Sequence, residues 1–233
     1  MKNEKKRRSL GVILTACVLT GMLVLSGCES IWCRNATGAA LDYLEQRYGQ
    51  EFVYSGPWGV GYTNLSVKQF LARPVEEQRD VLVRAAYEDD GYTFQDNYLA
   101  VKYESQMRER LQNTADASFE RSIVFYDVSY VTLSGDLPAD ASFEEYCRDD
   151  LSGILGSVAI SDAGFRQEQL RQFGQLVQDT GIHGLFRVAV LNDSQMDNLD
   201  RDKFDNIAGN KDYSWFFVLN ITADQVEISS EEG

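Results

Sequence analysis

The sequence predicts an α+β fold, with a mixed or mainly antiparallel sheet packed against three to four helices. Short runs rich in β-branched and aromatic residues indicate strands, and other stretches repeat their apolar residues at helical spacing. The two kinds of segment alternate irregularly along the chain, as in α+β proteins. With 44% hydrophobic residues, 12% aromatic residues and three prolines, the chain can bury one sizeable core or two small ones.

In the first half of the chain, the pattern predicts two helices and two strands. Gly49 supplies the left-handed stop of the first helix, and apolar residues four apart mark the second, longer helix. The predicted segments are the helix Thr37–Tyr48, the strands Glu51–Tyr54 and Val81–Tyr87, and the helix Asp96–Asn113.

The second half predicts four strands and two helices. Ser142 and Glu145 have the Ser-x-x-Glu spacing of a capping box, which starts a short helix with Phe143, Tyr146 and Cys147 facing inward. The other predicted segments are the strand Ile123–Leu133, the strand Ile154–Ile160, a helix capped by Asp162 and stopped at Gly181, and the strands Leu185–Leu191 and Ser214–Ile221.

The first 27 residues have the composition of a secretory signal. Five basic residues between Lys2 and Arg8 precede an uncharged apolar stretch. It ends in Leu25-Ser26-Gly27-Cys28, which resembles the lipobox of bacterial lipoproteins, in which the cysteine receives a diacylglycerol thioether and the chain is cut before it. An uncleaved membrane anchor would also be apolar over about 20 residues. The small-small-Cys ending has no role in such an anchor and favours the lipoprotein.

The resemblance implies a domain held by lipid on Cys28 at the outer face of the cell membrane. The chain then divides into a signal peptide (1–27), a lipidated cysteine with a short tether (28–34) and an extracytoplasmic α+β domain (35–233). Polar, aperiodic residues suggest a sub-boundary near 113–121. The segment Ala40 to Phe52, soon after the lipobox, resembles the opening of many small uncharacterised lipoproteins of Gram-positive bacteria, which carry no known activity to transfer.

The mature chain is strongly acidic. The whole sequence has 22 basic and 36 acidic residues, and the leader removes five basic residues and Glu4, which leaves 17 against 35 and a net charge of −18. Such a surface repels nucleic acid phosphates and anionic lipid headgroups. We therefore expect no nucleic acid partner, and attachment to the membrane through the acyl chains on Cys28.

The sequence contains no recognisable catalytic, cofactor-binding or metal-binding motif. His183, the single histidine, lies between glycines at the entry to a strand, which favours a structural role. Once Cys17 leaves with the leader and Cys28 is lipidated, Cys33 and Cys147 remain, and a disulfide between them stays open. A free Cys147 on the apolar side of its helix would act as a small hydrophobe. We expect no catalytic residue, cofactor or metal.

The first candidate for partner binding is the acidic run from Asp193 to Asp205. An EF-hand counted from Asp200 fails, because Phe204 takes a ligand position, Asp205 replaces the turn glycine and Lys211 stands where a bidentate glutamate belongs. The run is therefore interpreted as a solvated acidic loop. Its candidate contacts are Asp197, Asp200 and Asp202.

The second candidate is the segment from Ser55 to Thr63, rich in glycine and aromatic residues. Its glycines could present the rings of Trp58 and Tyr62 to a ligand or partner, as binding loops do. The alternative, which the composition favours, is that Trp58 packs into the core while the glycines turn the chain.

Together these features predict a binding or interaction module at the cell envelope, with a protein, an envelope polymer or a small ligand as its partner. The alternative is a carboxylate-dependent hydrolase acting on an envelope glycan. That activity would need two facing carboxylates, roughly 5 to 10 Å apart, in an open cleft. The lack of catalytic motifs favours the binding module over the enzyme.

Overall fold

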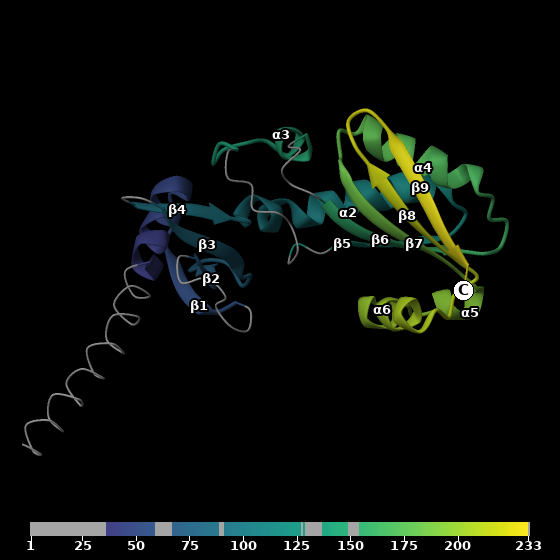
Figure 1. The fold of residues 1–233 in the computed structure, drawn as a ribbon, viewed down its shortest axis with the longest axis horizontal. Helices are drawn as coiled ribbons and strands as arrows, with labels where there is room; N and C mark the ends of the chain where they lie inside the picture. Colours follow the sequence, from purple (N-terminus) through teal and green to yellow (C-terminus); the bar gives the residue numbers. More distant parts are fainter. Residues whose placement is uncertain are drawn as a thin grey trace, which may run out of the picture.

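A computed structural model describes residues 36–58, 67–88, 91–126, 128, 137–148 and 154–232. Within these residues the α+β prediction is confirmed, with one antiparallel sheet, one mixed sheet and six helices, four of them substantial. The two sheets lie toward opposite ends of an elongated arrangement, and one long helix passes from the first to the second (Figure 1).

The first sheet is a four-stranded antiparallel meander in the order β1-β2-β3-β4. A helix over residues 36–48, called the N-terminal helix below, packs on one face, and its Ala40 and Leu44 share a hydrophobic cluster with Phe70 and Val83 of the sheet. Gly49 follows this helix with a φ of +68°, as predicted. The strands are β1 (Phe52–Pro57), β2 (Val67–Pro74), β3 (Val81–Glu88) and β4 (Gly91–Asp96).

The helix α2 (Tyr98–Ser118) belongs to both ends of the molecule. At about 1.5 Å per residue, its 21 residues span about 30 Å. Leu99 and Leu111, about three turns apart, lie in one hydrophobic cluster that reaches from Phe70 in the first sheet to Phe173 beside the second. One continuous core therefore connects the two sheets.

The predicted end of this helix at Asn113 is wrong, because α2 continues to Ser118. Ala115 is buried in the core, and the polar residues are satisfied locally: the hydroxyls of Thr114 and Ser118 donate to the carbonyls one turn earlier, at 2.8 and 3.1 Å. The polar segment near residues 113–121 is thus the last turn of α2 and its link to β5.

The second sheet has the order β5-β6-β7-β8-β9, in which β6 and β7 are parallel and the other neighbours antiparallel. The helices α2 and α4 (Glu168–Asp179) cover one face, and α5 (Asp193–Met196) and α6 (Arg201–Asn210) cover the other (Figure 1). The strands are β5 (Ser122–Tyr126), β6 (Ile154–Ser161), β7 (Gly184–Leu191), β8 (Trp215–Ile221) and β9 (Val226–Glu232).

The short helix α3 (Phe143–Cys147) begins with the predicted capping box. The Glu145 amide donates to the Ser142 hydroxyl at 3.3 Å, and the Ser142 amide donates to the Glu145 carboxylate at 2.7 Å. Tyr146 and Cys147 are fully buried, as expected. The helix is held on α2 by the hydroxyl of Tyr103, which donates to the Ala141 carbonyl at 2.6 Å.

Asp162 does not cap the next helix. It lies in the turn after β6, and α4 begins at Glu168 after Gln167, whose side chain makes no capping hydrogen bond. The stop at Gly181 is confirmed by its φ of +80°. The strand predicted to run to Leu133 is described only as far as Tyr126, and residues 129–136 lie outside the described part of the chain.

Candidate binding surfaces

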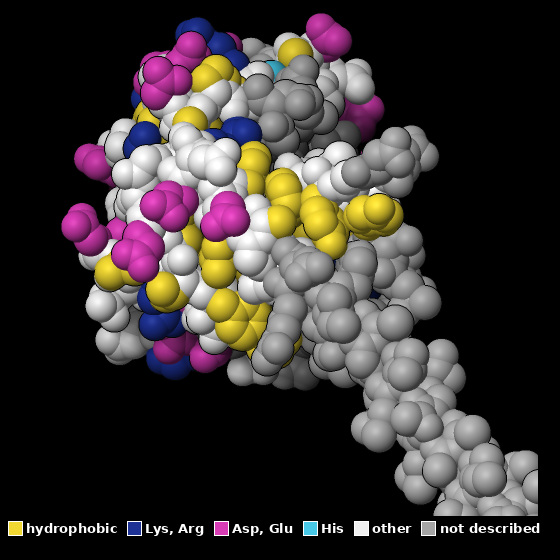
Figure 2. Space-filling model, turned by 90° about the vertical axis from the view of Figure 1, so that its left-hand side faces the viewer, with side chains coloured by type: hydrophobic (Ala, Val, Ile, Leu, Met, Phe, Trp, Pro, Cys, Tyr) yellow, Lys and Arg dark blue, Asp and Glu magenta, His cyan; other side chains and the backbone are white. Residues whose placement is uncertain are grey.

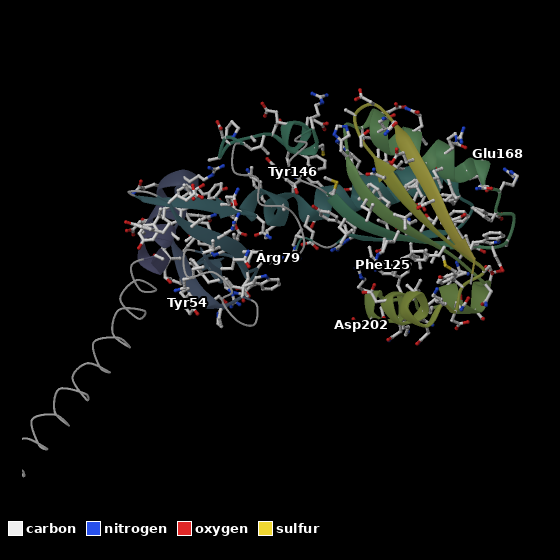
Figure 3. All side chains as sticks on the ribbon, viewed as in Figure 1. Tyr54, Arg79, Phe125, Tyr146, Glu168 and Asp202 are labelled. Atoms are coloured by element: carbon white, nitrogen blue, oxygen red, sulfur yellow. The ribbon has the colours of Figure 1, made fainter. Side chains whose placement is uncertain are left out.

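The structure separates the two surfaces that the sequence singled out. Trp58 follows β1 of the first sheet, whereas Asp197, Asp200 and Asp202 lie in the α5–α6 region beside the second sheet. Figure 3 labels Tyr54 of β1 and Asp202 of α6, which lie toward opposite ends of the molecule. Cys28 and Tyr62 lie outside the described residues.

The acidic run from Asp193 to Asp205 is not a loop, because it forms α5 and α6, although its carboxylates are exposed to solvent as expected. The carboxylate of Asp197 accepts a hydrogen bond from Arg121 at 2.8 Å. Asp193 lies 3.5 Å from the same guanidinium and accepts the hydroxyl of Ser161 at 2.8 Å. These two acids therefore fasten α5 to the edge of the second sheet.

Two more of these acids stabilise α6. Asp200 is its N-cap and accepts the Lys203 amide at 2.9 Å, and this hydrogen bond lowers the pKa of the Asp200 carboxyl. Asp205 accepts from Arg187 at 3.0 Å and from Arg201 at 2.7 Å. Asp202 is the one acid of the five that makes no ion pair with the described residues.

Apolar side chains explain why this segment is helical. Phe204 is fully buried and packs with Met196 and Leu199 against the outer face of the second sheet. In α5, Asn192 and Gln195 form a capping box. These apolar positions and capping residues could have predicted the two helices from the sequence. The many carboxylates suggested a loop instead.

Trp58 does not pack into the core, so that interpretation was wrong. Its side chain is 36% exposed at the end of β1, an edge strand that pairs with β2. Among the described residues, seven large hydrophobic side chains are exposed, and five of them belong to the first sheet and its turns. These five are Val53, Tyr54, Trp58, Val75 and Tyr87.

A row of four aromatic rings crosses from the N-terminal helix to the end of β3, and is called the aromatic row below. Tyr43 stacks on Phe94 at 5.1 Å between ring centroids, Phe94 on Tyr92 at 6.0 Å, and Tyr92 contacts Tyr87 at 5.3 Å. Tyr87 ends the row and is 44% exposed. Figure 2, which looks onto this end of the molecule, shows hydrophobic side chains gathered in a band. The sequence analysis missed the row, although Tyr87 and Tyr92 flank one turn.

Two buried acids fix the first sheet to α2. Asp96 is 1% exposed and accepts from the Tyr48 hydroxyl at 2.7 Å and the Tyr98 amide at 2.9 Å, while its second oxygen lies 4.0 Å from the Arg47 Nε. Burial raises the pKa of the Asp96 carboxyl. Glu104 of α2 forms ion pairs with two arginines, one of them Arg79 in the turn between β2 and β3 (Figure 3).

Neither Cys147 nor His183 forms a recognisable catalytic centre with the described residues. Burial raises the pKa of the Cys147 thiol to about 11, so the thiol stays protonated and unreactive at neutral pH. Cys33, its possible disulfide partner by sequence, lies outside the described residues. His183 is half-buried before β7. No group of three or more potential metal ligands occurs in the described part of the chain.

An open groove of about 600 Å³ lies between α2, α3 and α4, and two carboxylates, Glu109 and Glu144, line it. Arg110 donates to Glu144 at 2.9 Å and lowers the pKa of that carboxyl. A glycosidase acid needs the opposite shift, a raised pKa. Asp96, the carboxyl whose pKa burial raises, is buried beside the first sheet and does not line this groove.

Comparisons with family models, curated proteins and solved structures found no match to this chain. Among the described residues, no helix is both long and apolar enough to span a membrane.

Proposed function

We propose that the mature chain is a lipid-anchored binding module at the outer face of the cell membrane, and that it contacts an envelope partner through the first sheet. The observation that carries the proposal is the concentration of exposed apolar side chains there, five of the seven among the described residues. Figure 2 shows hydrophobic side chains gathered at this end of the molecule, and contiguous exposed apolar surface is typical of contact sites. The acids of α5 and α6 are weaker candidates, since four of the five are engaged within the protein.

The lipid anchor places the first sheet near the membrane in this proposal. Eight residues lead from Cys28 to Ala36, where the N-terminal helix begins, a reach of at most about 29 Å fully extended. The second sheet lies farther from the anchor, because it packs toward the other end of α2, a helix about 30 Å long. A partner approaching from the envelope and one lying in the membrane could both reach the first sheet.

The anchor is tested by Cys28→Ala in the producing cells. Without the thiol that receives the lipid, processing should stop, and the variant should accumulate in the membrane as a precursor heavier by the leader. Immunoblots of membrane and medium fractions measure this. A variant that is cut normally and released into the medium would refute the anchor.

The binding surface is tested by crosslinking on intact cells, with two tryptophan variants matched in exposure. Trp58→Ala changes the first sheet, and Trp215→Ala removes a ring of 38% exposure from β8. We expect the crosslinked partner to be lost or reduced with Trp58→Ala and kept with Trp215→Ala and with Asp202→Asn. If the crosslinked partner is lost only with Asp202→Asn, the contact lies on α6 and not on the first sheet. If the wild-type chain captures no partner, the binding function is contradicted.

A further inference from the structure

We infer that the aromatic row is a contact site for a cation, an arginine or lysine side chain on an envelope protein. The inference rests on the proposed binding function and names the chemistry of the partner. It combines three observations: the accessible end of the row at Tyr87, the acids on the same elements that make no ion pair with a described residue, and the net charge of the mature chain.

One ring of the row, that of Tyr43 on the N-terminal helix, already contacts a cation. The guanidinium of Arg47 lies over the ring of Tyr43 at 5.7 Å and over that of Tyr48 at 5.4 Å. The electron-rich face of an aromatic ring attracts such a cation. At the other end of the row, the Tyr87 ring is 44% exposed, so a cation from outside can reach it.

Carboxylates on the same elements favour a positive partner. Asp42 and Glu45 on the N-terminal helix and Glu88, which follows Tyr87 in β3, are exposed, and none makes an ion pair with a described residue. Arg47 is the one basic residue within 36–48, and it is engaged with Tyr43, Tyr48 and Asp96. The acids of α5 and α6 differ, because arginines of the protein already neutralise most of them.

The net charge indicates which kind of partner can bind the exposed apolar surface. A net charge of −18 on the mature chain repels a second copy of the chain and an anionic lipid surface. The same charge attracts a basic protein and raises its rate of association. A partner segment with arginine or lysine next to apolar residues matches both the rings and the carboxylates.

The test uses the full chain in neutral detergent micelles and a dye-labelled peptide of alternating glycine and arginine. The control peptide carries citrulline, an uncharged residue of the same shape as arginine. We expect fluorescence anisotropy to show binding of the arginine peptide and at least severalfold weaker binding of the citrulline peptide. Raising the salt from about 0.1 M to about 1 M shortens the Debye length from ~10 Å to ~3 Å and should weaken the arginine peptide's binding.

Variants assign the binding to the row. Tyr87→Leu keeps an apolar side chain without a ring and should weaken binding about two- to fivefold, the range for an exposed cation–π contact. Tyr87→Phe restores the ring and should bind as the wild type does. Glu88→Gln should weaken binding at low salt and have little effect at high salt. Trp215→Leu and Asp202→Asn, on the second sheet and α6, should leave binding unchanged.

Equal binding of the two peptides, or wild-type affinity of both Tyr87→Leu and Glu88→Gln, would overturn the inference. Thermal melts of each variant show whether a loss of binding is caused by unfolding. If Tyr87→Leu unfolds, Glu88→Gln and Tyr87→Phe still test the inference. The proposed function is tested separately from the cation site, by crosslinking on intact cells. If cells still crosslink the partner to Tyr87→Leu as to the wild type, the binding function stands and the cation site at the row does not.

Discussion

The two ends of the molecule use the same kinds of residue for different purposes. In the second sheet, helices cover both faces, and four of the five aspartates of the α5–α6 region cap a helix or pair with Arg121, Arg187 and Arg201. In the first sheet, aromatic rings and carboxylates remain at the surface. The comparison shows that residue type alone does not mark a binding surface, because partners inside the protein decide which charges and rings stay available.

The largest effect should come from the shared core. Phe173 of α4 is fully buried and contacts the rings of Phe119 and Phe186 at 5.6 and 6.1 Å, so Phe173→Ala should lower the free energy of unfolding by about 3–5 kcal/mol. Because one hydrophobic cluster joins both sheets, urea unfolding followed by circular dichroism should show one transition, shifted as a whole. Two transitions, with only one of them shifted, would mean that the sheets fold independently.

A smaller effect is expected where a ring of one strand of the second sheet covers a glycine of the neighbouring strand. A Cβ atom on Gly156 of β6 would lie 2.6 Å from the Phe186 ring, so Gly156→Ala should cost about 1–3 kcal/mol of stability. Gly209 of α6 has open space around it, and Gly209→Ala should stabilise the protein by up to about 1 kcal/mol through helix propensity. Chemical denaturation measures both. Similar effects of the two variants would contradict the packing at Gly156.

Asp96 should make stability depend on pH in the first sheet. Its pKa in the folded state is raised above the unfolded value of about 3.9, so its contribution to stability is complete below that value and is lost as the pH rises through the folded pKa. Asp96→Asn keeps an acceptor for Tyr48 and Tyr98 and is neutral at every pH. Urea titrations at a series of pH values above about 4 should show the variant gaining stability relative to wild type as the pH rises. A difference that is constant over this range would show that Asp96 does not titrate in this way.

The smallest effects on stability should distinguish the two acids at the start of α6, Asp200 and Asp202. Asp200→Ala removes the N-cap and should lower the melting temperature by a few degrees, whereas Asp202→Asn should leave it nearly unchanged. Differential scanning calorimetry provides the measurement. If the two variants melt together, the distinction between structural and available carboxylates fails at this end of the molecule.

The sequence predicted best those elements whose partners lie nearby in the chain. The capping box at Ser142, the glycine stops at Gly49 and Gly181, and the apolar strands β6, β7 and β8 are all confirmed. The strands β2, β4 and β9 were missed, because polar residues interrupt their apolar pattern. Lys68 in β2 shows why: it is almost fully buried, and its ammonium donates to the Thr37 hydroxyl at 2.5 Å.

The surfaces were harder to predict, because they depend on contacts between distant parts of the chain. Asp197 pairs with Arg121, 76 residues away, and Asp205 with Arg187 across the β7–α6 connection. Neither pairing can be inferred from a local pattern. Trp58 is exposed because it follows an edge strand, and the position of β1 in the sheet was unknown without β2.

The different topologies of the two sheets affect the order in which the chain can fold. In the first sheet each strand pairs with the next strand in sequence, whereas β6 and β7 lie parallel and are joined by a crossover through α4. Local pairings require less loop closure and form faster. A chain that folds from its N-terminus onward can therefore complete the first sheet while Leu111 and Ala115 of α2 still lack their partners from α4 and the second sheet. During this interval the later turns of α2 are the segment most exposed to aggregation and proteolysis.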